Sequence, residues 1–384
     1  MAIYLDYAAT VPMSPEVLAV YTDALAVVGN PSSIHSFGQS ARQMVEEARE
    51  GIALAVNADR NEVIFTSGGT EANNLAIKGL FWERNRELAT RKKIVSAYTE
   101  HHAVTDTIEW LEKHEGAEPI WAPVSENGEI DFDWYRSYLS ENANEIALVT
   151  FMLANNETGI ITDVRNFARE ANKHDIPSHS DAVAAFGYLP INFSEIGLST
   201  MAISAHKVGG PVGVGALIVS RSTKITSLMQ GGGQERGIRS GTLNAAGNRA
   251  FAFAAEKALD SMDAHNDHTR KLIEQIRNSV LANIPGARFS RGEQPGLAHN
   301  AHFTFAGAKS DSLLFLLDQA GIAASAGSAC QAGVARPSHV LLAMGRSEAE
   351  ANGTLRFTVG AATTQADIDH LLDILPDLVV TARA

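Results

Sequence analysis

One lysine stands at an unusual place in the sequence. Lys207 closes the apolar stretch of "LSTMAISAHKVGGPVGVGAL" (198–217), and glycines follow it almost at once. The residues at 200–204 predict a buried strand, so the lysine amine lies where water is scarce. Burial disfavours a charged amine, and a neutral amine can form a Schiff base with an aldehyde. The position of Lys207 therefore indicates carbonyl chemistry.

Four other predicted strands also end in polar residues. Each strand end, taken singly, has an ordinary explanation as a tight turn, a helix cap or a buried histidine. Taken together with Lys207 they predict a pocket, because ligands bind beyond the carboxyl ends of strands in open α/β sheets. These residues are Gly68, Gly69 and Thr70 after 62–67, His101 after 93–98, Asn155 and Asn156 after 145–153, and Asp181 at the end of 176–181.

The residue types at these strand ends suit one cofactor. Amide groups at a helix start and the Thr70 hydroxyl form an anion site for a phosphate. Asp181 precedes Lys207 by 26 residues, which allows one crossover between parallel strands. A phosphate site, a Schiff-base lysine, a carboxylate for a ring nitrogen and a flat ring such as His101 are what pyridoxal phosphate requires.

The elements that must position these residues alternate along the chain. Nearly continuous apolar strands separated by helices predict an α/β fold with a mostly parallel sheet covered on both faces. After about residue 245 a long helix is predicted up to residue 280, with a break near 261–267, and then few strands among helices. That texture predicts a smaller α+β domain at the C-terminal end. The helices expected in the first part are 71–87, 102–114 and 164–174, and its further strands are 200–204 and 213–220.

Composition narrows the class of protein. Apolar residues make up 45% of the 384 residues, and the net charge is −13, which argues against a nucleic-acid partner. No apolar run is long enough to span a bilayer and no signal sequence is apparent, so we expect a cytoplasmic protein. The single cysteine, Cys330, permits no intrachain disulfide. His265 and His268 are three residues apart, but a solvated helix face explains them better than a metal site, and no metal is predicted.

Many short motifs resemble, in order and spacing, the cysteine desulfurases of the class V aminotransferase family. The resemblance extends from Tyr4 to about Leu375. It implies a fold-type I transferase dependent on pyridoxal phosphate, with a large domain at 15–255 and a small α+β domain at 1–14 and 256–384. The motifs are "YLDYAAT", "GNPSSIHSFG", "FTSGGTEANNLAIKG", "TEHHAV", "ANNETG", "SAHKVGGPVGVGAL", "GGGQERGIRSGTLN", "GSACQAG" and "GTLRFTVG".

The resemblance also implies a role for each site residue. Lys207 looks like the lysine that holds the cofactor, and His101 looks like the ring stacked on it and a proton shuttle. Asp181 looks like the partner of the ring nitrogen, and Arg356 like the clamp on the substrate carboxylate, a task that suits its planar fork. The remaining implied contacts are Gly69, Thr70, Ser204 and His206 to the phosphate, Thr242 to the phosphate of a neighbouring subunit in a homodimer, Asn156 to the ring hydroxyl or the substrate, and Asn30 assisting Arg356.

Cys330 looks like the sulfur acceptor of this family. A lone cysteine is most often a small buried hydrophobe, but "AASAGSACQAGVARPS" has no apolar periodicity and predicts a mobile loop in which a thiol can ionise. The implied reaction converts L-cysteine to L-alanine and leaves a persulfide on Cys330. The sulfur would then pass to a protein acceptor such as an iron–sulfur scaffold, and Cys330 could transiently ligate a cluster. Iron–sulfur assembly and other sulfur-transfer pathways use this same chemistry.

Two departures from the family pattern keep alternatives open. Ala184 stands where the family usually has a glutamine that contacts the ring hydroxyl, and the chain stops at Ala384 where longer members continue toward a scaffold-docking segment. A selenocysteine lyase, with the same chemistry on selenium, is the nearest alternative. A catalytically silent scaffold that keeps the fold is the alternative from another class. Retention of Lys207, Asp181 and Cys330 favours the enzyme.

Overall fold

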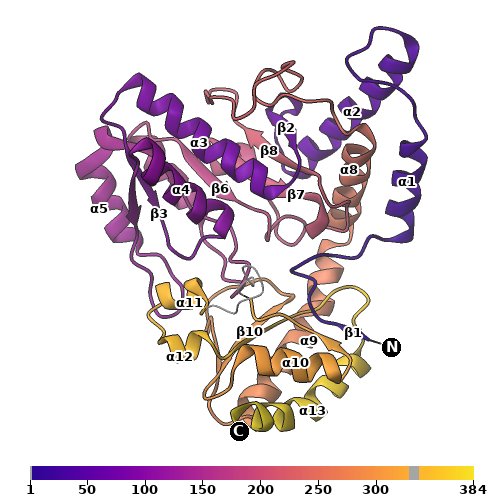
Figure 1. Ribbon diagram of the computed structural model, residues 1–384, viewed down its shortest axis with the longest axis vertical. Helices are drawn as coiled ribbons and strands as arrows, with labels where there is room; N and C mark the ends of the chain where they lie inside the picture. Colours follow the sequence, from indigo (N-terminus) through magenta and orange to yellow (C-terminus); the bar gives the residue numbers. More distant parts are fainter. Residues whose placement is uncertain (1, 328–336) are drawn as a thin grey trace.

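The computed structural model describes residues 2–327 and 337–384 (Figure 1). Within these residues the main sheet has seven strands, and its order departs from chain order because helical crossovers connect the strands. From one edge to the other the strands are β2 (Val63–Thr66), β8 (Gly215–Val219), β7 (Thr200–Ser204), β6 (Ser178–Asp181), β5 (Ile146–Thr150), β3 (Lys93–Ser96) and β4 (Glu118–Trp121).

The strands of this sheet run in one direction except for β8. Strand β8 is antiparallel to both of its neighbours, β2 and β7, which therefore run the same way as each other. The pairs β7–β6, β6–β5, β5–β3 and β3–β4 are all parallel. The predicted mostly parallel sheet is confirmed, and the carboxyl ends of β2, β3, β5, β6 and β7 share one edge.

Both faces of the main sheet are buried by helices. Strand β7 shows how its sequence achieves this, because successive side chains point to opposite faces. Ala202 packs in a cluster with α3 (Gly69–Glu87), whereas Met201 and Ile203 pack in a cluster with α2 (Ser36–Ala55) and α8 (Ala245–Asp260). Helix α4 (His102–Glu115) lies beside α3, and α6 (Val164–Lys173) lies on the face of α2 and α8.

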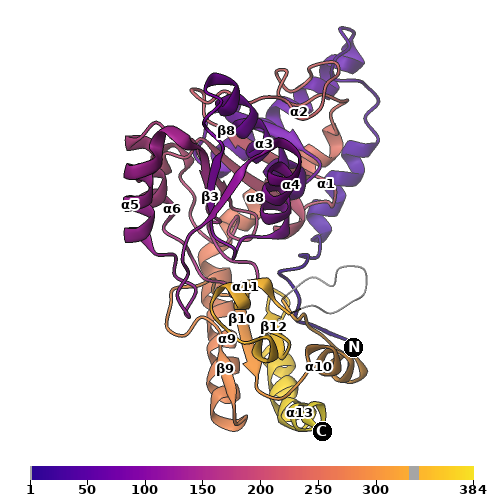
Figure 2. The ribbon, with the colours of Figure 1, turned by 60° about the vertical axis from the view of Figure 1, so that its left-hand side comes forward.

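A second sheet lies at the other end of the molecule (Figure 2). Strands β9 (Ala287–Phe289), β10 (Asn300–Phe305) and β12 (Thr354–Thr358) are antiparallel, with β10 in the centre. Its core, with Phe303 and Phe357 fully buried, packs against α9 (Met262–Asn283), α10 (Ser310–Gln319) and α13 (Gln365–Arg383). Helix α8 gives way to α9 at Ser261, within the predicted break. The domain boundaries at 14/15 and 255/256 stay a prediction.

The N-terminal segment connects the two sheets. Strand β1 (Ile3–Tyr4) pairs with β11 (Ile322–Ala323), and Asp6 forms a bridge with Thr358 at the end of β12. A few residues later, the Val11 amide donates to the His206 carbonyl at 2.9 Å. The other helices are α1 (Pro15–Leu25), α5 (Phe132–Asn142), α7 (Phe193–Ile196), α11 (His339–Ala343) and α12 (Glu348–Ala351).

Candidate active site

A cavity of about 430 Å³ lies at the carboxyl edge of the main sheet. Its walls come from the strand ends of this sheet, from the N-terminal segment and from the second sheet. The cavity brings together most of the predicted site residues: Gly69, Thr70, His101, Asn156, Asp181, Ser204, His206, Lys207 and Arg356. Ala184 lines it as well, whereas Asn30 and Thr242 do not. Cys330 lies outside the described residues.

Lys207 projects into the cavity from a short 3-10 turn. The turn, Ala205–Lys207, follows β7 directly and changes the direction of the chain at the sheet edge. The Nζ amine donates to the carbonyl oxygens of Ala8 and Ala9, at 2.6 and 3.0 Å. Burial lowers the pKa of Lys207 to about 8, helped by the charge of Arg356 and opposed by Asp181 and Asp6. About a tenth of this amine is therefore neutral at pH 7, far more than of an ordinary lysine, which is the direction that the sequence predicts.

The Asp181 carboxylate is buried and held in one orientation. Its Oδ2 accepts a hydrogen bond of 2.6 Å from the side-chain amide of Asn73, and its Oδ1 accepts one of 2.9 Å from the Val183 backbone. Asp181 is the last residue of β6, and its side chain is 5% exposed. Hydrogen bonds to both oxygens thus fix the orientation of this carboxylate at the edge of the cavity.

His101 is the N-cap of α4 and faces the cavity. Its Nδ1 accepts a hydrogen bond of 3.0 Å from the Ala103 amide, so the neutral ring carries its hydrogen on Nε2. Burial lowers the pKa of His101, the charge of Lys207 lowers it further, and Asp181 opposes both effects. A neutral, flat ring with one donor nitrogen results.

The start of α3 offers an anion site on the same cavity. The N-cap is Gly68, with φ of +151°, and no side chain caps the helix, so the amides of its first turn lack a side-chain acceptor. A Cβ at Gly69 would lie 2.7 Å from Val183, which explains glycine at this approach. Nearby, the buried Ser204 Oγ has no hydrogen-bond partner among the described residues. These unused donors fit a phosphate group.

His206 lies beside this anion site. Its Nδ1 is 3.2 Å from the Thr10 hydroxyl of the N-terminal segment. Burial lowers its pKa to about 4, and the charge of Lys207 contributes to the same shift. His206 is therefore neutral near neutral pH, and it adds a hydrogen-bonding ring rather than a positive charge.

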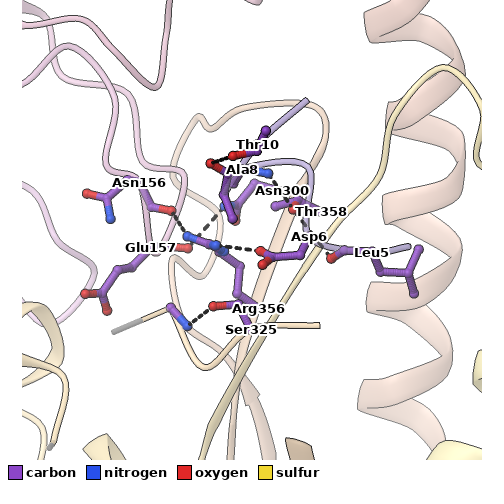
Figure 3. A network of polar contacts seen from close by, with 12 residues as sticks. Leu5, Asp6, Ala8, Thr10, Asn156, Glu157, Asn300, Ser325, Arg356 and Thr358 are labelled. Atoms are coloured by element: carbon purple, nitrogen blue, oxygen red, sulfur yellow. Dashed lines mark hydrogen bonds and ion pairs between the residues drawn. The ribbon is translucent and has the colours of Figure 1, made fainter. Parts of the chain in front are cut away.

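Arg356 is buried on the opposite wall of the cavity (Figure 3). Its Nη2 forms an ion pair of 2.8 Å with Asp6, and its Nη1 donates to the Asn156 carbonyl at 2.7 Å. Its backbone exchanges two hydrogen bonds with Ser325. Within the described chain, the Nε of Arg356 and the Oδ1 of Asn156 have no partner. The guanidinium is thus fixed in place, and of its three nitrogens only Nε has no partner among the described residues.

Sequence reasoning missed two residues that shape this site. Asn73 holds Asp181, and Asp6 holds Arg356. Both residues lie inside quoted motifs, "FTSGGTEANNLAIKG" and "YLDYAAT", so a signal was present. A polar residue one helical turn after Thr70 lies on the same face of α3, and that spacing would have pointed to Asn73.

Over residues 2–327 and 337–384, histidine, cysteine and acidic side chains nowhere form a group of three that could hold a metal ion. No helix in these ranges is long and apolar enough to cross a membrane.

Comparisons with known proteins agree with the geometry. The family model described as "Aminotransferase class-V" matches residues 3–371. An "IscS-like cysteine desulfurase" from Mycobacterium tuberculosis is 45% identical over 99% of this chain and 97% of its own length. A solved "NIFS-LIKE PROTEIN" superposes with a TM-score of 0.90 at 29% identity, covering 99% of this chain and all of that one. A structure titled "SspA in complex with cysteine" gives a TM-score of 0.79 at 30% identity, covering 94% and 100%.

Proposed function

The chain belongs to the class V aminotransferase family and is a cysteine desulfurase, and we propose that its cavity holds pyridoxal phosphate and L-cysteine side by side. Enzymes of this family in general depend on pyridoxal phosphate. The observation that carries the proposal is the convergence of Lys207, Asp181, Ser204 and Arg356 on one cavity, from three separate segments of the chain.

The residues present fit the cofactor. The phosphate would lie against the start of α3 with Thr70, where the orphaned Ser204 hydroxyl and His206 supply further partners. Asp181 would face the ring nitrogen, and the flat ring of His101 would stack on the cofactor. Asn156 would contact the ring hydroxyl or the substrate. When bound, pyridoxal phosphate supplies an aldehyde for amines and an electron-withdrawing ring that stabilises negative charge at the substrate Cα.

Lys207 would move the proton at the substrate Cα. Its pKa near 8 leaves part of the amine neutral and able to accept that proton at physiological pH. The carbonyls of Ala8 and Ala9 accept from Nζ, so they stabilise the protonated amine that results. The Nε2 hydrogen of His101 offers a second site from which a proton can be delivered.

Arg356 would hold the substrate carboxylate. Its side chain is fixed by Asp6 and by the Asn156 carbonyl, which orients the guanidinium before substrate arrives. Its Nε is buried and has no hydrogen-bond partner within the described chain. Asn30, which is exposed in this single chain, is proposed to assist Arg356 as the family resemblance implies.

Cys330 would receive the sulfur. Gly327 lines the cavity and is the last described residue before Cys330. The Cys330 thiolate attacks the sulfur of L-cysteine, and the bond between this sulfur and the substrate Cβ breaks. The substrate Cβ then takes up a proton, which gives L-alanine. Cys330 is left as a persulfide. The terminal sulfur then passes to a protein acceptor in iron–sulfur cluster assembly or another sulfur-transfer pathway.

The active form is proposed to be a homodimer. Several large apolar side chains on α1, on the segment that follows it and at the start of α2 are exposed, which is unusual for a surface that meets only water. Thr242 is also exposed and does not line the cavity of its own chain, so it is free to reach the phosphate of a neighbouring subunit. The exposed apolar residues are Leu18, Leu25, Val28, Ile34 and Phe37.

A Cys330→Ser variant tests the proposed function. The variant should bind pyridoxal phosphate like the parent protein, because the cofactor contacts lie elsewhere, but it should form no alanine from L-cysteine. Absorbance of the bound cofactor and alanine release measure the two properties. Full turnover by the variant would refute the role of Cys330. Turnover of the parent protein on L-cysteine and on L-selenocysteine, measured in parallel, distinguishes a desulfurase from a selenocysteine lyase. An absorbance band of the bound cofactor that does not shift on addition of L-cysteine would indicate a silent scaffold.

A further inference from the structure

A row of buried polar side chains leads from the core to Asp181. The Thr200 hydroxyl is 2.9 Å from Nδ1 of His179, Nε2 of His179 is 2.9 Å from Oδ1 of Asn73, and Nδ2 of Asn73 is 2.6 Å from Oδ2 of Asp181. Asn73, His179 and Thr200 are each no more than 1% exposed. Buried polar groups are costly unless they are paired, and here each one pairs with the next.

The direction of every hydrogen bond in this row follows from the chemistry of its members. The Asn73 amide must turn its NH2 toward Asp181, because the opposite orientation would place two acceptor oxygens 2.6 Å apart. Its carbonyl oxygen then faces His179, so Nε2 of His179 carries the hydrogen. Burial lowers the pKa of His179 to about 3, which keeps the ring neutral, and Nδ1 accepts from the Thr200 hydroxyl.

Three packed elements hold this row in place. On β6, His179 and Asp181 are two residues apart and point to the same face of the sheet. On α3, Thr70 and Asn73 are three residues apart and share the face that covers β6 and β7. Thr200 stands directly beside His179 in the parallel ladder of β6 and β7. The helix that starts at the proposed phosphate site therefore also carries the residue that contacts Asp181.

We propose that Asn73 and His179 are positioning residues, which hold the Asp181 carboxylate turned toward the ring nitrogen of the cofactor. The inference rests on the proposed binding of pyridoxal phosphate. Two donors, the Asn73 amide and the Val183 backbone, fix one lone pair on each oxygen of Asp181 and leave the others for the pyridinium hydrogen. His179 fixes Asn73 in turn, so that the amide cannot flip and present its oxygen to the carboxylate.

Loss of the Asn73 donor should weaken the contact between Asp181 and the cofactor. A hydrogen bond to a charged group typically changes an equilibrium about tenfold or more. For Asn73→Ala we therefore expect the dissociation constant of pyridoxal phosphate to rise about tenfold. The ring nitrogen should also become less protonated, because the carboxylate that stabilises its hydrogen is no longer held. A purely structural role for Asn73 would not move that protonation.

The experiment uses the full-length protein with nitrogen-15 labelled pyridoxal phosphate. The ring-nitrogen resonance reports protonation, a titration gives the dissociation constant, and thermal unfolding reports stability. Asn248→Ala is the matched control, because Asn248 is a buried helical asparagine (2% exposed) that does not line the cavity. We expect both cofactor readouts to shift in Asn73→Ala and neither to shift in Asn248→Ala. A parent-like resonance and dissociation constant in a folded Asn73→Ala would overturn the inference.

A pair of variants at His179 keeps the test decisive if Asn73→Ala does not fold. His179→Gln retains an N–H donor toward Asn73, whereas His179→Leu removes it. We expect the ring-nitrogen resonance of His179→Gln to stay near that of the parent and that of His179→Leu to move toward the neutral form. Equal behaviour of the two variants would overturn the role of His179. If the parent protein itself does not bind pyridoxal phosphate, the proposed function is wrong. If the parent binds the cofactor and the variants behave like the parent, only the role of Asn73 and His179 is wrong.

Discussion

The two walls of the cavity are built in different ways. The sheet wall consists of Thr70, His101, Asp181, Ser204 and Lys207, which follow the carboxyl ends of β2, β3, β6 and β7. The terminal wall consists of Ala8, Ala9 and Arg356, and Arg356 is held by Asp6, which lies 350 residues away in the chain. Strand pairing within one sheet brings the sheet wall together, with β2 joined to β7 through the antiparallel β8. The terminal wall exists only once the N-terminal segment has reached β12.

The basic side chains of the two walls have different hydrogen-bond partners. Lys207 of the sheet wall meets two neutral carbonyls, and burial lowers its pKa to about 8. Arg356 of the terminal wall meets a carboxylate, Asp6, at 2.8 Å. A lysine with a lowered pKa suits proton exchange, and the planar guanidinium of an arginine suits binding of an anion. From this difference we propose that the sheet wall serves the reaction and that the terminal wall serves recognition of the substrate.

Replacement of Lys207 should produce the largest effect. Lys207→Ala removes the amine that would carry the proton at the substrate Cα, so we expect alanine formation to fall about a thousandfold or more. Steady-state assays with L-cysteine and saturating pyridoxal phosphate measure the loss. Lys224→Ala, a change outside the cavity, serves as a control and should retain the parent rate. If Lys207→Ala formed alanine at a rate within tenfold of the parent rate, the sheet wall would have no essential part in the reaction.

The pH dependence of the parent protein reports the same amine. Only neutral lysine attacks an aldehyde, so cofactor uptake by the cofactor-free protein should rise about tenfold per pH unit below pH 8. Because the pKa lies below its ordinary value of 10.5, the rise should level off near pH 8 instead of continuing to pH 10. Stopped-flow absorbance measures the uptake. A rate that keeps rising above pH 9 would show an ordinary, solvated lysine.

A change at Arg356 should have a smaller effect and act on binding. Arg356→Lys keeps the charge but loses the planar fork that contacts Asp6 and Asn156 at the same time. We expect the KM for L-cysteine to rise about tenfold to a hundredfold, with the larger part of the effect in KM rather than in kcat. Initial rates over a range of L-cysteine concentrations separate the two constants.

Arg288→Lys is the matched control for this change. Arg288 lies on β9 of the second sheet, half-exposed and paired with an exposed Glu126, and it does not line the cavity. Its KM should equal that of the parent. If Arg356→Lys changed kcat alone and left KM unaltered, the terminal wall would not be a recognition surface, and the contrast between the two walls would fail.

The sheet wall and its fold could be predicted from sequence for a physical reason. A short apolar run that ends in a polar residue indicates both a buried strand and the end at which its functional residue lies. The predicted strands at 62–67, 93–98 and 200–204 match β2, β3 and β7 closely. The break in the long helix was also visible near Ser261. These signals are local, because each depends on a few neighbouring residues.

The terminal wall gave no such local signal. Asp6 acquires its partner only through a contact across the whole chain, and Arg356 was identified by family resemblance rather than by its surroundings. Strand β4 escaped prediction because it is a four-residue edge strand that contains Pro119. Helices α1, α2 and α5 lie outside the predicted alternation of strands and helices, although each begins with a side-chain cap.

The smallest expected effect concerns Ala184 on the sheet wall. This position lines the cavity with a methyl group, where the family pattern has a glutamine that contacts the ring hydroxyl. Ala184→Gln should add one neutral hydrogen bond and lower the dissociation constant of pyridoxal phosphate about twofold to tenfold. Ala184→Leu fills similar space without a hydrogen bond and is the control, measured in the same titration. If glutamine tightened binding while leucine did not, the sheet wall would have room for a further contact. If glutamine weakened binding as much as leucine, the wall around Ala184 would be packed for a small residue, and the missing hydrogen bond would be supplied by another member of the site.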